Sequence, residues 1–212
     1  MATTVIEKQN TLLETDKPLT REQKDLFAYF GVNAKIVPPL RILNPQNVFI
    51  GDYTAIREGC HWNAFRDLSF LRDYISPEFI SAFSADDYMY NAHITVEREC
   101  QIGRFSFMSC TNEIRLERNV LLSERVFVGD NNHGFSHPDI PIMQQPNKRG
   151  IPVQIGRGTW IGVGAAILAG VRLGQNTVVG ANSVVHGGSY PAHAVIAPPA
   201  AVVTFQRHPD VE

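Results

Sequence analysis

The sequence is poor in cysteine and nearly balanced in charge. Its three cysteines, Cys60, Cys100 and Cys110, lie far apart among 212 residues and form no C-x-x-C pair. Such a sparse, odd set predicts reduced thiols in a cytoplasmic protein. The formal net charge of -2 gives no overall attraction to nucleic acid or to an anionic surface. We therefore do not expect nucleic acid as a partner.

A long hydrophobic run is also missing. The longest weakly polar stretch, residues 160–171, is too short to span a bilayer and is rich in glycine. The N-terminal sequence MATTVIEKQN lacks the apolar segment of a secretory signal peptide. These absences predict a chain with no membrane span and a cytoplasmic location.

What the sequence has instead is a six-residue repeat over residues 155–190. The first place of each repeat is aliphatic, the second is Gly in four of the six repeats, and the fifth is small. The first places are Ile155, Ile161, Ile167, Leu173, Val179 and Val185. A period of six is neither that of a helix nor that of a single strand, and it is typical of a parallel β-helix. A buried helix is the alternative, but so much glycine would destabilise it.

The repeat has a direct physical interpretation. One large aliphatic side chain in every six, always in phase, predicts one inward-pointing side chain on each flat face. A small fifth residue fits a tight corner, and we expect the Gly after the aliphatic residue to adopt backbone angles that other residues resist. Stacked coils about 4.8 Å apart pair strand to strand and bury a continuous apolar column.

The segments Trp160-Ile161-Gly162 and Val179-Gly180-Ala181-Asn182-Ser183-Val184-Val185 resemble the hexapeptide-repeat acyltransferases, in particular the sugar and polysaccharide O-acetyltransferases. The resemblance implies an all-β fold, a left-handed parallel β-helix with three faces, and assembly as a homotrimer. The left hand is implied by the resemblance alone, because general crossover rules favour the right hand.

The rest of the chain divides around this repeat. Residues 1–40 are expected to form an N-terminal arm and a short helix, which Thr20 and Gln23 begin with a capping box and Gly31 ends. Residues 41–204 are expected to form the β-helix domain, and residues 205–212 a C-terminal tail.

Two segments interrupt the period. The first, at about 66–90, is aromatic and acidic, and we expect a helix within it from about Pro77 to Phe83. Packing against the coil or a neighbouring subunit and shaping an acceptor pocket are both open as its role. The second, at about 131–152, is a polar loop that we interpret as the active-site loop.

The second interruption carries the candidate catalytic residue. It begins just after Gly129 with Asp130-Asn131-Asn132-His133, and histidine is the side chain that exchanges a proton near neutral pH. Loops held by rigid scaffolds often carry function. The resemblance implies that His133 is the general base that deprotonates the acceptor. Asp130 and Asn131 are expected to orient His133 or bind a sugar hydroxyl, and His137 to bind the acceptor or shape the loop.

The resemblance further implies acetyl-CoA as the acyl donor, bound beside the C-terminal coils. Its expected contacts are Trp160, the small residues that let a ligand approach the backbone, and His186, which with Gly187 stands where many family members have a Thr-Lys pair. The small residues are Gly162, Ala165, Gly180 and Ala181. The expected acceptor is a hydroxyl of a saccharide. The alternative is the amine of an amino sugar, a nucleotide-linked sugar or an aminated antibiotic.

Two further classes of protein remain as alternatives. A carbonic anhydrase of the gamma type uses the same fold with three histidines on zinc, and His93, His133 and His137 are available. The proline-containing loop and the Trp-Ile-Gly segment favour the transferase instead, so no metal is expected. A non-catalytic β-helix scaffold is the other alternative, and it would not bind acetyl-CoA.

Overall fold

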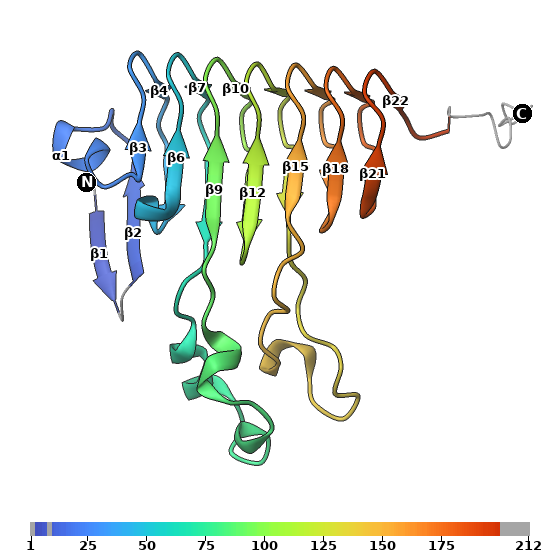
Figure 1. The fold of residues 1–212 in the computed structure, drawn as a ribbon. Helices are drawn as coiled ribbons and strands as arrows, with labels where there is room; N and C mark the ends of the chain where they lie inside the picture. The colour runs from blue at the N-terminus through green and yellow to red at the C-terminus, as the bar shows by residue number, and fades with distance from the viewer. Residues whose placement is uncertain (1–2, 8–9, 200–212) are drawn as a thin grey trace, which may run out of the picture.

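The computed structural model describes residues 3–7 and 10–199. Three sheets run along one coil, with β3 near one end and β22 at the other (Figure 1). The all-β, left-handed parallel β-helix is confirmed. The predicted tail at 205–212 lies outside the described residues, and so does the end of the predicted 41–204 domain.

The chain visits the three sheets in turn, and we name them faces A, B and C. Face A contains β1 (Thr3–Glu7), β2 (Asn10–Thr15), β5 (Leu40–Leu43), β8 (Cys60–Ala64), β11 (Phe107–Cys110), β14 (Phe127–Gly129), β17 (Ala166–Ile167) and β20 (Val184–Val185). Face B contains β3 (Tyr29–Phe30), β6 (Val48–Ile50), β9 (His93–Val96), β12 (Glu113–Leu116), β15 (Val153–Ile155), β18 (Val171–Leu173) and β21 (Gly188–Tyr190). Face C contains β4 (Lys35–Ile36), β7 (Ala55–Ile56), β10 (Gln101–Ile102), β13 (Leu121–Leu122), β16 (Trp160–Ile161), β19 (Val178–Val179) and β22 (Val195–Ile196).

The predicted inward residues form the core of the coil. The six aliphatic first-place residues are all between 0% and 3% exposed. The small fifth-place residues face inward as well, except Ser189. With that exception, each six-residue repeat therefore buries its first-place and fifth-place side chains. Stacking of the coils joins these side chains into one core.

The glycines of the repeat act differently from our expectation. The second-place Gly162 does not have a positive φ; a Cβ there would lie 2.6 Å from the Ala181 nitrogen of the next coil. The left-handed angles occur two places later, for example at Gly164, with φ of 69°. The second-place glycines are thus required because adjacent coils approach closely, and the expectation of special backbone angles at these positions was wrong.

The N-terminal part differs from the sequence prediction in extent. The capping box of Thr20 and Gln23 is confirmed, but helix α1 (Arg21–Lys24) ends well before Gly31. The reason is that β3 already pairs with β6, so the first coil begins at Tyr29. The expected N-terminal arm contains an antiparallel hairpin of β1 and β2, and β2 pairs with β5 of the coil.

Both interruptions leave the coil at the same corner, between faces A and B. The first follows β8 and the second follows β14, and they project side by side from the coil (Figure 1). The expected helix at 77–83 is replaced by short 3₁₀ helices. These are η2 (Ser69–Tyr74), η3 (Ile80–Ala82) and η4 (Ala85–Tyr88), with η5 (Ile142–Gln144) in the second interruption and η1 (Pro45–Asn47) before β6.

Candidate functional site

His133 lies at the neck of the second loop, where the outgoing and returning chains pair. It forms an antiparallel bridge with Asn147. The flanking hydrogen bonds run from Lys148 N–H to the Asn132 carbonyl (2.8 Å) and from Gly134 N–H to the Pro146 carbonyl (2.9 Å). His133 and Asn147 are therefore a non-hydrogen-bonded pair, whose side chains are neighbours and whose own backbone groups point away from the ladder. The imidazole is exposed, as a base that meets a substrate requires.

Asp130 anchors the base of this loop. Its carboxylate is 0% exposed and accepts hydrogen bonds from the backbone N–H groups of Thr111 (2.9 Å) and Asn112 (2.8 Å). Its backbone carbonyl accepts the N–H of Ile151 at the returning end (2.8 Å). The side chain thus joins the preceding coil to both ends of the loop. It was predicted to orient His133 or to bind the acceptor; its carboxylate is buried away from any acceptor, and an effect on His133 would act through the loop backbone.

The corner that Asp130 binds is the place where the repeat slips in the sequence. Paired strands there stand further apart in sequence than in the C-terminal coils, since Phe107 pairs with Phe127 whereas Ile167 pairs with Val185. The longer coil provides the turn whose amides face the Asp130 carboxylate. The irregularity in the period therefore provides the backbone amides that bind Asp130, close to the candidate base.

Asn131 and His137 both hold the loop in shape. The Asn131 amide donates to the Ser109 carbonyl (2.9 Å) and to the Asp130 carboxylate (3.0 Å). The His137 ring meets the edge of Phe83 with centroids 5.3 Å apart, and its carbonyl accepts from the Gln145 amide (3.0 Å). A shaping role for His137 agrees with these contacts.

Most of the predicted donor residues lie elsewhere on the coil. Trp160 stands on face C, 49% exposed, and its indole N–H donates to the Ser123 hydroxyl (3.0 Å). Gly162, Ala165, Gly180 and Ala181 follow at the corner between faces C and A. The Ala165 side chain is buried in the core, and a Cβ on Gly162 would meet the next coil, so stacking already explains part of this set of small residues. His186 is exposed at the A/B corner, where its carbonyl accepts the Tyr190 hydroxyl (2.9 Å).

The predicted site residues therefore form two groups in one chain. His133, Asp130, Asn131 and His137 come together at the A/B corner, whereas Trp160 and the small residues lie on face C and at the C/A corner. Face A separates the two corners. His186 alone of the expected donor contacts shares the A/B corner with His133, and one chain does not bring Trp160 or the small residues to the candidate base.

The cysteines and histidines give no support for other chemistries within one chain. All three thiols are buried and free, and burial raises the pKa of Cys60 and Cys100 to about 12 and also raises that of Cys110. Thiolate nucleophiles are disfavoured by such surroundings. Among the described residues, no three His, Cys, Asp or Glu side chains are grouped to hold a metal ion, so the triad of His93, His133 and His137 is not assembled. No helix in the described ranges has the length and apolar composition to cross a membrane.

Sequence reasoning missed the contact between the two interruptions. Tyr90, at the end of the first, donates its hydroxyl to the Asn147 carbonyl in the neck of the second (2.9 Å). A signal was present: both breaks come after a strand of face A, so they leave from the same corner of the coil. Counting strands within the repeat could have shown that the two segments are neighbours.

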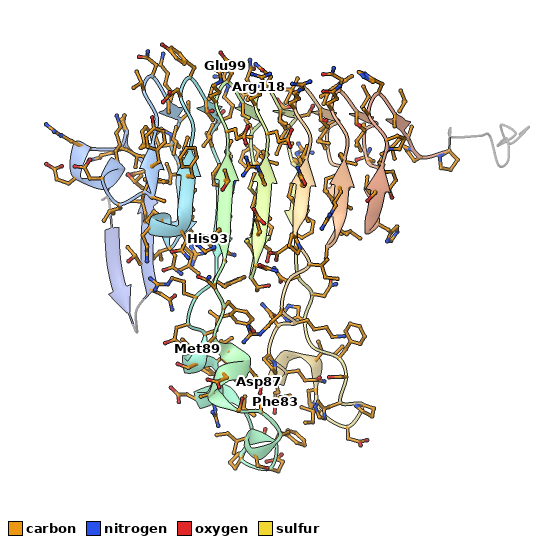
Figure 2. All side chains as sticks on the ribbon, in the orientation of Figure 1. Phe83, Asp87, Met89, His93, Glu99 and Arg118 are labelled. Atoms are coloured by element: carbon orange, nitrogen blue, oxygen red, sulfur yellow. The ribbon has the colours of Figure 1, made fainter. Side chains whose placement is uncertain are left out.

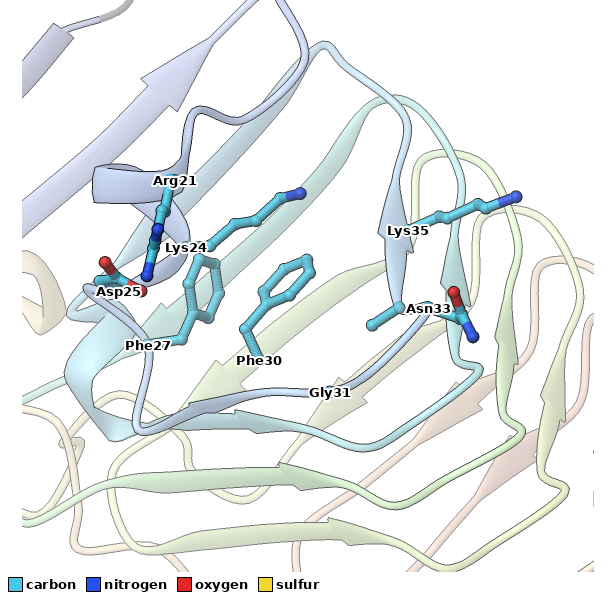
Figure 3. Close-up of a pocket in the computed structure, with 9 residues that line it drawn as sticks. Arg21, Lys24, Asp25, Phe27, Phe30, Gly31, Asn33 and Lys35 are labelled. Carbon is cyan, nitrogen blue, oxygen red and sulfur yellow. The ribbon is translucent and has the colours of Figure 1, made fainter.

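A separate cavity of about 670 Å³ lies at the N-terminal end of the coil. Arg21, Lys24 and Lys35 line it together with Phe27 and Phe30. Lys24 lies over the Phe30 ring, whereas Lys35 points away from both (Figure 3). The cationic groups do not converge on one point, and the cavity is remote from His133.

Comparisons with known proteins agree with this fold. The family model for the bacterial transferase hexapeptide (six repeats) matches residues 152–187. WbbJ of Escherichia coli K12, named as a lipopolysaccharide biosynthesis O-acetyl transferase, is 35% identical over 120 residues, covering 51% of this chain and 58% of that protein. A Mycobacterium tuberculosis protein named as an acetyltransferase is 30% identical over 102 residues, covering 48% of this chain and 34% of that protein.

The solved structures show the same architecture. AntD, an N-acyltransferase from Bacillus cereus crystallised with dTDP and 3-hydroxybutyryl-CoA, has a TM-score of 0.62 at 20% identity, covering 87% of this chain and 86% of that one. The chain is thus a left-handed β-helix protein built from hexapeptide repeats. Its resemblance to the hexapeptide-repeat acyltransferases is confirmed. The matched segments span 58% and 34% of the two curated relatives.

Proposed function

We propose that the protein transfers an acetyl group from acetyl-CoA to a hydroxyl of a saccharide acceptor. The observation that carries this proposal is an exposed His133 on a hydrogen-bonded neck, anchored by the buried Asp130. The rigid coil and the buried core beneath the neck supply the fixed geometry that general-base catalysis requires. The name of the E. coli relative favours a saccharide hydroxyl as the acceptor.

In the proposed reaction His133 accepts the proton of the acceptor hydroxyl as its oxygen attacks the thioester carbonyl. A new ester C–O bond forms, the C–S bond breaks, and the proton passes from the imidazolium to the departing thiolate. The transfer is direct, since Cys60, Cys100 and Cys110 are buried and none is available to carry the acyl group. An acceptor amine would react by the same sequence of steps.

The separation of the two groups of site residues supports a homotrimer. If face A of each copy faces a threefold axis, the A/B corner of one copy meets the C/A corner of the next. The outward side of face A suits such burial, because it carries the stacked rings of Phe107 and Phe127 and, further along, Val184, which is 57% exposed. Each site then takes His133 from one copy and the donor contacts, Trp160, Gly180 and Ala181 among them, from its neighbour.

The first test removes the candidate base. His133→Ala should lower kcat by about 10²–10⁴, the usual contribution of a general base. The dissociation constant for acetyl-CoA, measured by calorimetry, should change little, because the imidazole acts on the acceptor's proton.

His137→Ala serves as the comparison in the same loop, and its effect should be much milder. Turnover of His133→Ala near the parental rate would overturn the proposal. Release of free CoA, followed against a panel of sugars, nucleotide sugars and aminoglycoside-type amines, would identify the acceptor. A preference for amines would replace O-acetylation by N-acetylation.

A further inference from the structure

The two segments that leave the coil fold onto each other as one unit. They share an apolar core that is separate from the core of the coil. Its buried members are Leu68, Ile75, Phe83, Tyr88, Tyr90 and Ile140. Ile140 comes from the His133 loop and the others from the first interruption, so the far end of the loop is seated in the insertion. Phe83 and Asp87 lie in this projecting unit, and His93 stands where the chain has rejoined the coil (Figure 2).

Polar contacts fix the outer half of the loop to the insertion. The Ser76 N–H donates to the Gln144 side-chain oxygen (3.2 Å), and the Gln144 amide donates back to the Ser76 hydroxyl (3.1 Å). The Phe83 ring meets His137 edge to face. These contacts hold the loop tip, but they lie away from the neck that carries His133.

At the neck the contact is made by Tyr90. Its hydroxyl lies 2.9 Å from the Asn147 carbonyl oxygen and 3.0 Å from that of Asp87, and the single phenolic proton serves both acceptors. The Asn147 carbonyl points out of the ladder because Asn147 and His133 are a non-hydrogen-bonded pair. Burial raises the pKa of Tyr90 to about 12, so the hydroxyl keeps its proton at neutral pH.

We infer that Tyr90 positions His133. Its hydroxyl holds the Asn147 carbonyl, and with it the strand that faces His133, so that the first interruption braces the neck of the second. This inference rests on the proposed role of His133 as the base. A base displaced by about 1 Å can lose on the order of 10²-fold in rate, which gives the brace a measurable effect.

The insertion itself provides a matched pair of variants. Tyr90→Phe removes the hydroxyl that binds Asn147. Tyr88→Phe removes a hydroxyl that is buried in the same core and has no hydrogen-bond partner among the described residues. Both variants keep the aromatic ring, so a difference between them reports the hydrogen bond rather than packing.

Tyr90→Phe should lower kcat by about 10–10²-fold while the KM for acetyl-CoA stays within about twofold, and Tyr88→Phe should keep the parental values. The backbone amides of Gly134 and Lys148 should exchange with solvent about 5–10-fold faster in Tyr90→Phe alone, because a net hydrogen bond is lost beside them. In a His133→Ala background, adding Tyr90→Phe should change the residual rate little, because the two residues act as one unit.

The outcomes separate the two proposals. A His133→Ala enzyme with full activity overturns the proposed function. If His133→Ala is inactive but Tyr90→Phe turns over like Tyr88→Phe, the positioning role is overturned and the base assignment stands. Equal exchange at Gly134 and Lys148 in the two tyrosine variants also overturns it, as does an equal loss of rate from Tyr90→Phe with and without His133.

Discussion

Asp130 shows how a single buried residue can anchor the loop that carries the candidate base. It follows β14 directly, so it is fixed by the coil, and its carboxylate satisfies backbone N–H groups of the corner below. The Asn131 amide also donates to it. Because a carboxylate is an acceptor only, it suits a position surrounded by donors.

This surrounding predicts the effect of an isosteric change. Asp130→Asn would turn an NH₂ group toward the N–H of Thr111 or Asn112 and leave a buried donor without a partner. The free energy of unfolding should fall by about 1–3 kcal/mol, measured by chemical denaturation. Asp139→Asn, an exposed acid in the same loop, is the control and should have little effect. Equal denaturation midpoints for the two variants would contradict the anchoring role.

The sequence could predict which residues lie near His133 better than it could predict what each of them contacts. His133, Asp130 and Asn131 are adjacent in the chain at a break in a regular period, so their proximity follows from the sequence alone. The burial of Asp130 does not, because it depends on the long corner at residues 111–112 one coil below. Tyr90 was missed for the same reason: its contact with Asn147 crosses 57 residues of sequence.

Among the elements, the C-terminal coils were the most predictable. There each inward position recurs every six residues, so the pattern gives both the core and the phase. The N-terminal coils carry only fragments of the period, and the capping box at Thr20 indicated a helix without indicating its length. Strand pairing overrides helix formation at Tyr29, because a coil strand satisfies its backbone groups on β6.

The spacing between coils gives a prediction about the second-place glycines. At Gly162 a Cβ would lie 2.6 Å from a backbone nitrogen, whereas at Gly180 the nearest atom is the Ala197 Cβ at 3.1 Å. Gly162→Ala should therefore force adjacent coils apart and cost about 1–3 kcal/mol, as overpacking does. Gly180→Ala should cost less, because a side-chain atom can move more easily than a backbone.

Thermal melting of the two glycine variants checks this order. A Gly162→Ala protein that melts with the parent would show that the coils tolerate a larger separation. The measurement also tests the corrected explanation of these glycines, since a requirement for special backbone angles would penalise both positions alike.

For the whole molecule, the arrangement of the three faces matters more than any single pocket. The candidate base lies at one edge of face A, and the expected donor contacts other than His186 lie at the other edge or on face C. No movement of a loop within one chain would join them, because the coil between them is a packed core. In the proposed threefold arrangement, the A/B corner of each copy contacts the C/A corner of the next. This contact is heterologous and closes into a ring of three copies.

Mixed assemblies test that arrangement directly. His133→Ala removes the base, and Ala181→Arg places a bulky side chain at the exposed C/A corner where the donor is expected. Each variant alone should be inactive and should show by light scattering about three times the 23.6 kDa mass of one chain. When the two are coassembled in equal amounts, about a quarter of the sites should combine an intact corner from each of two neighbours and regain activity.

If each chain holds a complete site, every site keeps one defect and the mixture stays inactive. A mixture without activity, or a mass equal to one chain, would therefore overturn the shared site, whereas recovered turnover would place His133 and the donor contacts on different copies.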